Sequence, residues 1–274
     1  MISLLSILLS AADALAAPPA HDGLIDLRDT ALSEPVALDG HWQFWWQALV
    51  TPDGRSTTPP TGVLQVPQPW NDLTTPNGPA PGTGFGTYHL TVQLPDTHPP
   101  LGLVVGRIST AHRLWINGVE QPGRGQVGTH AEEAVGHMRR TLLPIPADTG
   151  TLDILIQVSN FDHRAGGLRQ PLTLGEWTVQ NRRVQRTVLL HGMGVVFLLV
   201  NGLTFLLMYV VHPRDPARLW FALMCLVVAL RAAVGTSSDT VHLLLPALST
   251  PWLLRIEYIA VFCGIAVAVT LARS

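Results

Sequence analysis

The feature that most constrains this chain is an apolar run from Val188 to Val211 that contains no Asp, Glu, Lys or Arg. At ~1.5 Å per residue, a helix of that length crosses the ~30 Å hydrocarbon core of a bilayer. Two further apolar stretches follow, on either side of a linker at 235–254. The mean hydropathy of +0.29 also places part of the chain in lipid. We therefore expect three transmembrane helices, at 188–211, 219–234 and 256–272.

The first sixteen residues are apolar and end in Ala14-Leu15-Ala16, the small-residue pattern that a signal peptidase reads. We interpret residues 1–16 as a signal peptide that is cleaved near Ala16. The segment before the apolar run has no Arg or Lys, so an uncleaved anchor or a misplaced start codon is the alternative. Either way, we expect the domain that follows to be exported.

The arginines around the first span give conflicting signals about its orientation. Arg214 and Arg218 in the turn after it are typical of a cytoplasmic loop, whereas Arg182, Arg183 and Arg186 before it favour the opposite direction. The signal peptide decides between them. We expect a multi-pass protein of the bacterial inner (cell) membrane, with the N-terminal domain periplasmic or extracellular.

Residues 17–180 are rich in Pro, Gly and Thr, and their short apolar runs are separated by turn residues, a pattern typical of an all-β domain. Because both cysteines, Cys225 and Cys263, lie inside apolar runs, this domain has no disulfide. We predict a two-sheet sandwich at 17–180. Its candidate strands are 24–28, 42–46, 63–66, 87–94, 101–108, 111–116, 139–145, 151–158 and 172–179.

Two local patterns sharpen this expectation. Residues 87–94 alternate between apolar and polar side chains, so Thr87, His89, Thr91 and Gln93 should face water on a half-buried strand. Asn117-Gly118 tolerates positive φ at both centres of a type I′ turn, which predicts a tight hairpin. Residues 123–137 have too little apolar surface for a strand, and we expect a surface loop there.

The order of these motifs resembles the bacterial seven-transmembrane receptors with diverse intracellular signalling modules. The resemblance implies an all-β jelly-roll ectodomain of galactose-binding type, then seven helices and a cytoplasmic output such as a cyclase or kinase. Three spans and no output are present, so the chain is expected to be a fragment or a shortened relative. The residues that carry the resemblance are Leu38-Asp39-Gly40-His41-Trp42-Gln43-Phe44, Val66-Pro67-Gln68-Pro69-Trp70, Gly84-Phe85-Gly86-Thr87-Tyr88, Thr110-Ala111, Trp115-Ile116-Asn117-Gly118, Val158-Ser159-Asn160-Phe161, His163-Arg164, Gly166-Gly167-Leu168, Trp220-Phe221-Ala222-Leu223, Leu230-Arg231 and Glu257-Tyr258.

Several function classes are disfavoured by the sequence. A net charge of -2 creates no field that would attract nucleic acid. There is no serine elbow, phosphate loop or zinc helix motif, and Asp153 with Asp162 makes no convincing glycosidase pair. We therefore expect no enzyme, no cofactor and no metal site, since one His beside one Asp falls short of a ligand set.

Aromatic side chains with polar neighbours are the candidates for binding a sugar or another small molecule. Trp42, Phe44 and Tyr88 alternate within strands and are interpreted as core. The loop at 159–170 has two readings: it clasps a ligand or docks on the membrane helices, or its Asx residues and glycines only turn the chain. The ligand-binding candidates are Trp70, Arg113, Trp115, Asn117, Asn160, Asp162, His163 and Arg164.

Polar residues within the spans are the candidates for coupling, because charge in lipid is costly unless it is paired. They are His191, Arg231 and Glu257, while Asn201 is interpreted as a helix-packing residue. We hypothesise that Arg231 pairs with Glu257 near the outer leaflet. The alternative is that Arg231 extends to the interface by itself.

The function expected from the sequence is a receptor whose sandwich senses an extracellular small molecule or carbohydrate. Its helices would pass the change inward to a cytoplasmic signalling module, in cis or in trans, and a homodimer is compatible with this role. The alternative is a membrane-anchored carbohydrate-binding module without signalling. A transporter subunit is disfavoured because the spans hold few polar residues to line a path.

Overall fold

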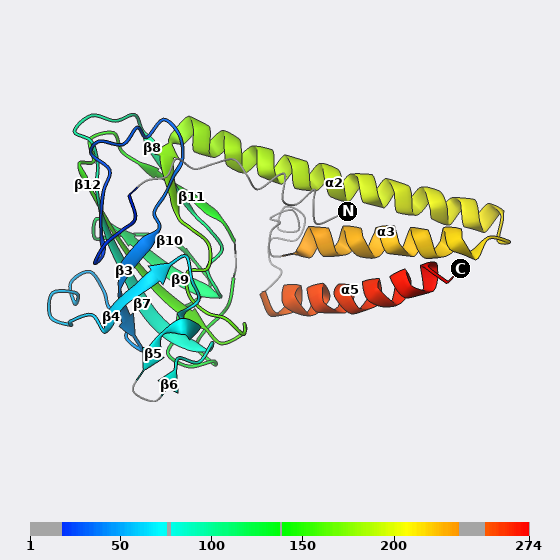
Figure 1. Cartoon of the computed structure of the whole chain (residues 1–274), viewed down its shortest axis with the longest axis horizontal. Helices are drawn as coiled ribbons and strands as arrows, with labels where there is room; N and C mark the ends of the chain where they lie inside the picture. Colours follow the sequence, from blue (N-terminus) through cyan, green and yellow to red (C-terminus); the bar gives the residue numbers. More distant parts are fainter. Residues whose placement is uncertain (1–17, 76–77, 138, 236–249, 274) are drawn as a thin grey trace. The chain divides into compact units, whose positions relative to one another are not determined.

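The computed structural model describes residues 18–75, 78–137, 139–235 and 250–273. The predicted signal peptide at 1–16 lies outside these ranges, as does most of the predicted linker at 235–254. The chain divides into two compact units, with the boundary between Arg182 and Arg183. The first unit is built from two main β-sheets, with β5 and β6 pairing as a small third sheet, and the second unit is built from apolar helices, as predicted (Figure 1).

The larger sheet has seven strands. Its order is β10-β9-β12-β7-β3-β4. β1 pairs in parallel with the C-terminal residues of β7, Thr91 to Gln93, which follow the part of β7 that pairs with β3. The long central strands β7 and β12 pair antiparallel over their full length, from Gly84↔Asn160 to Gln93↔Thr151. The bounds are β1 Leu24–Asp26, β3 Gly40–Trp46, β4 Gly62–Val66, β7 Gly84–Gln93, β9 Ala111–Ile116, β10 Val119–Arg124 and β12 Thr151–Asn160.

The smaller sheet has four strands in the order β11-β8-β13-β2. Side chains from both sheets form one buried cluster, which includes Trp42 and Tyr88 from the larger sheet and Leu103 and Leu174 from the smaller one. The two sheets therefore pack face to face as a sandwich. The remaining bounds are β2 Val36–Ala37, β5 Thr74–Thr75, β6 Gly78–Pro79, β8 Leu101–Val105, β11 Thr141–Ile145 and β13 Thr173–Glu176, with the 3-10 helix η1 at Trp70–Asp72.

Several sequence predictions are confirmed in this unit. Trp42, Phe44 and Tyr88 are fully buried, as core residues should be. The hairpin between β9 and β10 turns at Asn117 and Gly118, whose φ angles are 50° and 77°. The loop predicted at 123–137 begins two residues later than expected, because Gly123 and Arg124 still belong to β10.

The expectation that Thr87 and His89 face water is wrong, because a third layer covers the outer face of the larger sheet. The connection between β3 and β4 folds over this face, and Val50 N donates to Thr87 Oγ1 at 3.0 Å. Thr87 Oγ1 donates in turn to Ala48 O at 2.7 Å, and Gln157 Nε2 donates to Val50 O at 3.0 Å. Polar side chains satisfied in this way can be buried without the usual cost.

The last predicted strand, 172–179, is too long. β13 ends at Glu176, which pairs with Leu101, the first residue of β8. Pro99 and Pro100 precede Leu101, and proline cannot donate to a sheet ladder, so the partner strand ends there. The backbone turns helical at once, and Trp177 N donates to Pro100 O at 2.9 Å.

Three helices follow: α2 Trp177–Val211, α3 Pro216–Val234 and α5 Thr250–Leu271. Each contains a segment long and apolar enough to cross a membrane. They begin earlier than the predicted spans, which started at 188, 219 and 256. Asp215 caps α3 by accepting a hydrogen bond from Ala217 N at 3.2 Å.

Small side chains bring these helices together within the second unit. Ala222 and Ala229 of α3 and Ala260 of α5 are buried, and Val227 Cγ1 of α3 lies 3.5 Å from the place that a Cβ on Gly264 of α5 would take. Phe205 of α2 packs on Phe221 of α3 with ring centroids 4.5 Å apart. Close packing at small residues is the usual way helices associate in lipid, where the hydrophobic effect gives no drive.

Candidate functional site

The loop between β12 and β13 contains the candidates Asp162, His163 and Arg164, and its conformation is set by Asn160, the last residue of β12. The Asn160 side chain is fully buried and its Nδ2 donates to Gly82 O at 2.7 Å and to His163 O at 2.6 Å. Its Oδ1 accepts from His163 N at 3.1 Å. The Asx-turn reading of this residue is confirmed, so Asn160 shapes the loop and has no atom left for a ligand.

A second loop interlocks with the first. Trp70 Nε1 donates to Pro81 O and Gly82 O, both at 3.1 Å, and Asn71 Nδ2 donates to Arg164 O at 3.2 Å. Gly166 lies so close to the Trp70 ring that a Cβ there would be 2.2 Å from Trp70 Cζ2. The backbone of 159–168 is thereby fixed against Trp70, Asn71 and Gly82.

Trp70 itself is fully buried under this interlock. The expectation that its ring offers a stacking face for a sugar is therefore wrong. Its edge-on contact with Trp46, at a centroid distance of 5.4 Å, shows where the ring is used instead. Trp70 is therefore a buried residue on which the loop packs.

The side chains that the loop leaves exposed are Asp162 and Arg164. His163 between them is half-buried, and its Nδ1 accepts a hydrogen bond from Ala165 N at 3.1 Å. A fixed backbone that presents a carboxylate and a guanidinium can bind a polar ligand at little entropic cost, because the binding groups are already placed. We take Asp162 and Arg164 as the candidate site.

The remaining candidates, Arg113, Trp115 and Asn117, lie on or beside β9. Asn117 serves the hairpin, since Nδ2 donates to Thr151 O at 3.1 Å and Oδ1 accepts from Asp153 N at 2.7 Å. The Arg113 guanidinium lies 4.9 Å from the centroid of the Trp115 ring. It also pairs with Glu120 at 2.9 Å. Trp115 is only 6% exposed, so it too lacks a free stacking face.

A polar cluster that sequence reasoning missed joins the β3–β4 connection to strands β3, β7 and β12 on the outer face of the larger sheet. Arg55 Nη1 donates to Asp153 Oδ2 at 2.6 Å and also contacts His89 Nε2. His89 Nδ1 lies 3.0 Å from Gln43 Oε1. Burial alone would raise the pKa of Asp153, but the hydrogen bonds from His89 and Arg55 lower it overall. The sequence signal for this cluster was Arg55 in a polar connection, but the alternation pattern assigned His89 to water.

One buried titratable group in the core has no hydrogen-bond partner. His112 on β9 is 1% exposed, and neither ring nitrogen is paired in the part of the chain that the structure describes. Burial, together with the smaller effect of the charge of Arg124, lowers the pKa of His112 to about 4. The ring is therefore neutral at pH 7.

The coupling candidates lie in the second unit. Arg231 on α3 is exposed, and in the described parts of α3 and α5 no ion pair joins it to Glu257. Glu257 Oε1 instead lies 4.0 Å from the place that a Cβ on Gly235 would take. The hypothesised Arg231–Glu257 pair is thus absent from the described helices. His191 lies on α2, half-buried, and has interactions of its own.

No group of three or more His, Cys, Asp or Glu side chains within the described ranges could hold a metal ion.

We expect Asn160→Ala to destabilise the sandwich by about 2 kcal/mol, because it removes three buried hydrogen bonds and leaves their partners unpaired. Asp162→Ala, two residues away and exposed, should cost less than about 0.5 kcal/mol. Urea unfolding of the detergent-solubilised chain, followed by tryptophan fluorescence, measures both. Equal losses in the two variants would show that Asn160 does not hold the loop.

Comparison with known proteins finds only partial structural matches at low identity. No family model matches the sequence, and no curated protein does. Among solved structures, a β-glucuronidase of Ruminococcus gnavus is 18% identical with a TM-score of 0.38, over 51% of this chain and 28% of that chain. The same enzyme with D-glucuronic acid gives 18% identity and a TM-score of 0.39, over 51% of this chain and 29% of that chain. The chain thus spans less than a third of the length of these structures.

Proposed function

We propose that this chain is the sensor and membrane portion of a bacterial receptor. In this proposal the sandwich is a jelly roll of galactose-binding type that lies outside the inner membrane and binds a small molecule or a carbohydrate. The helices pass its state inward to a cytoplasmic signalling module. The chain itself has no catalytic role.

The observation that carries this proposal is the direct passage from sheet to membrane helix. β13 is an inner strand of the smaller sheet, and α2 begins at the next residue and runs without a break to Val211. At its base, Gln180 is buried and its Nε2 donates to Thr173 O at 2.9 Å. Gly102 of β8 lets Trp177 approach, since a Cβ on Gly102 would lie 3.3 Å from Trp177 Cε3.

This arrangement favours a receptor over an anchored binding module. A membrane-anchored binding module functions equally well with a flexible linker. A receptor needs a rigid connection between its sensor domain and its membrane helices to transmit a conformational change. A ligand can shift the helices only by the difference between its affinities for two states of the sandwich, and a shift from 1:99 to 99:1 needs about 5.5 kcal/mol. A displacement of β13 relative to β8 would be transmitted directly to α2, because α2 begins at the residue after β13.

The test uses the chain in nanodiscs with an environment-sensitive dye on Cys263 of α5, which is exposed, after Cys225→Ala removes the buried thiol. A panel of neutral sugars, uronic acids and amino acids is added while tryptophan fluorescence reports binding to the sandwich. We expect at least one compound to change both signals. Insertion of Gly-Gly-Ser-Gly after Arg183 should then abolish the dye response while binding remains.

A helix-forming Ala-Glu-Ala-Ala-Lys-Ala-Ala insertion at the same site is the matched control and should keep a dye response. Binding that never changes the dye signal in the unmodified chain would favour the anchored module. A response that survives the glycine insertion would rule out coupling through α2.

A further inference from the structure

The beginning of α2, before its apolar run, has a strongly one-sided charge. Residues 177–187 include Arg182, Arg183 and Arg186, and the whole helix from Trp177 to Val211 contains no Asp or Glu. In the proposed orientation these arginines lie outside the membrane, against the usual bias of basic residues toward the cytoplasm. An acidic partner outside the helix would account for them.

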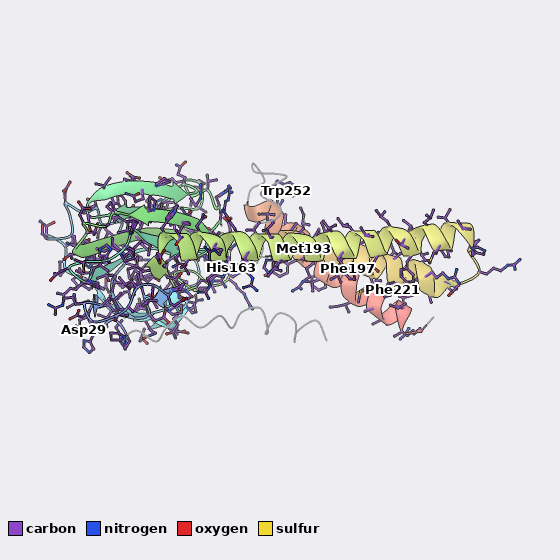
Figure 2. The ribbon with its side chains drawn as sticks, turned by 90° about the horizontal axis from the view of Figure 1, so that it is seen from above. Asp29, His163, Met193, Phe197, Phe221 and Trp252 are labelled. Carbon is purple, nitrogen blue, oxygen red and sulfur yellow. The ribbon has the colours of Figure 1, made fainter. Side chains whose placement is uncertain are left out.

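Two of the arginines share the helix face that enters lipid. Arg182 and Arg186 are exposed and one turn apart, while Arg183 is half-buried and has contacts of its own. The next residues on that face are Leu189, Met193 and Phe197, which are 65%, 68% and 67% exposed. Figure 2 shows Met193 and Phe197 along α2. This face of α2 therefore carries arginine side chains before Leu189 and apolar side chains from Leu189 onward.

We propose that Arg182 and Arg186 bind the phosphate of an anionic phospholipid headgroup. At ~1.5 Å per residue, Arg186 stands ~4.5 Å and Arg182 ~10 Å along the helix from Leu189. The headgroup region on each side of a bilayer is roughly 5 to 8 Å thick, so Arg186 lies within it. Arg182 lies just beyond its outer edge, and its long side chain must extend toward the membrane to reach a phosphate there. Guanidinium binds phosphate in a planar, bidentate way, which also favours Arg over Lys at this place.

The two arginines would set the position of α2 along the membrane normal. They hold α2 at one level in the bilayer while the apolar stripe below them contacts acyl chains. The level of the helix would then depend on the lipid, independently of whether the sandwich binds a ligand or signals.

The test compares lipid retention by the full chain. The protein is extracted mildly from nanodiscs of equal parts phosphatidylcholine and phosphatidylglycerol, and native mass spectrometry counts the lipids that remain bound. Each arginine near an anionic surface should contribute about fivefold in preference. We expect enrichment of phosphatidylglycerol, and a fall of at least about fivefold in that enrichment for Arg182→Gln/Arg186→Gln.

The matched control is Arg28→Gln/Arg113→Gln, which removes two arginines that the structure pairs with Asp26 and Glu120 in the sandwich. It should retain the enrichment of the unmodified chain. Arg182→Lys/Arg186→Lys should retain part of the phosphatidylglycerol enrichment. This variant also checks that the fold tolerates substitution at these two positions. No enrichment in the unmodified chain, unchanged enrichment in the double Gln variant, or an equal loss in the control would each overturn the proposal.

Discussion

Gly166→Ala should destabilise the sandwich by at least about 3 kcal/mol, the range of strong overpacking in a core that cannot relax. A Cβ at this position would lie 2.2 Å from Trp70 Cζ2 and 2.7 Å from Gly82 O. Neither neighbour can retreat, because the Trp70 ring is fully buried and its Nε1 already bonds Gly82 O at 3.1 Å. The substitution must therefore separate the two interlocked loops.

Gly150→Ala is the matched control, because nothing lies within 4 Å of a Cβ there and its φ is not in the positive range. It should change the free energy of unfolding by less than about 0.5 kcal/mol. Both variants can be compared by urea unfolding of the detergent-solubilised chain. A Gly166→Ala variant as stable as Gly150→Ala would mean that the loops are not locked together, and the candidate site would lose its fixed backbone.

The second large effect is a loss of sandwich stability in mild acid that depends on His112. Its pKa is about 4 in the folded chain because the ring is buried, against about 6.5 in the unfolded chain. Between these values the unfolded state binds the extra proton, so stability is complete above pH ~6.5 and falls as the pH drops toward 4. At ~1.4 kcal/mol per pKa unit the loss amounts to about 3 kcal/mol.

His112→Leu removes this titration and two unpaired buried nitrogens while filling a similar volume. We expect the variant to be at least as stable as the unmodified chain at pH 7, and to lose about 3 kcal/mol less between pH 7 and pH 4. His137, whose pKa is also lowered by burial and by Arg124 and Arg139, remains as background in both proteins. Parallel pH profiles for the two chains would contradict the assignment.

Much of the architecture could be predicted from the sequence because it depends on local patterns. The uncharged run at 188–211 predicts an apolar helix long enough to cross a membrane, and the Asn117-Gly118 dipeptide predicts its hairpin. The failures came where another segment changes the environment of a residue. Thr87 and His89 alternate as solvent-facing residues do, but residues 48–58 return to cover them.

The candidate site was predictable in position but not in detail. The density of Asn, Asp, His and Gly at 159–170 marked a special loop, and the loop is indeed built by Asn160. Sequence could not separate the side chains that build it from those it presents, because the partners of Asn160 and Gly166 lie far away at Gly82 and Trp70. Trp70 was assigned to ligand stacking for the same reason.

The continuity of α2 is the central claim, and hydrogen–deuterium exchange on the full chain in nanodiscs tests it most directly. If α2 is one helix from the sheet to Val211, amides from Asn181 onward, where the i→i−4 hydrogen bonds begin, should be protected without a gap, including residues 183–187 at the boundary of the two compact units. Rapid exchange confined to 183–187, with protection on both sides, would instead reveal a flexible tether. That result would contradict coupling through α2 and leave the sandwich as an anchored binding module.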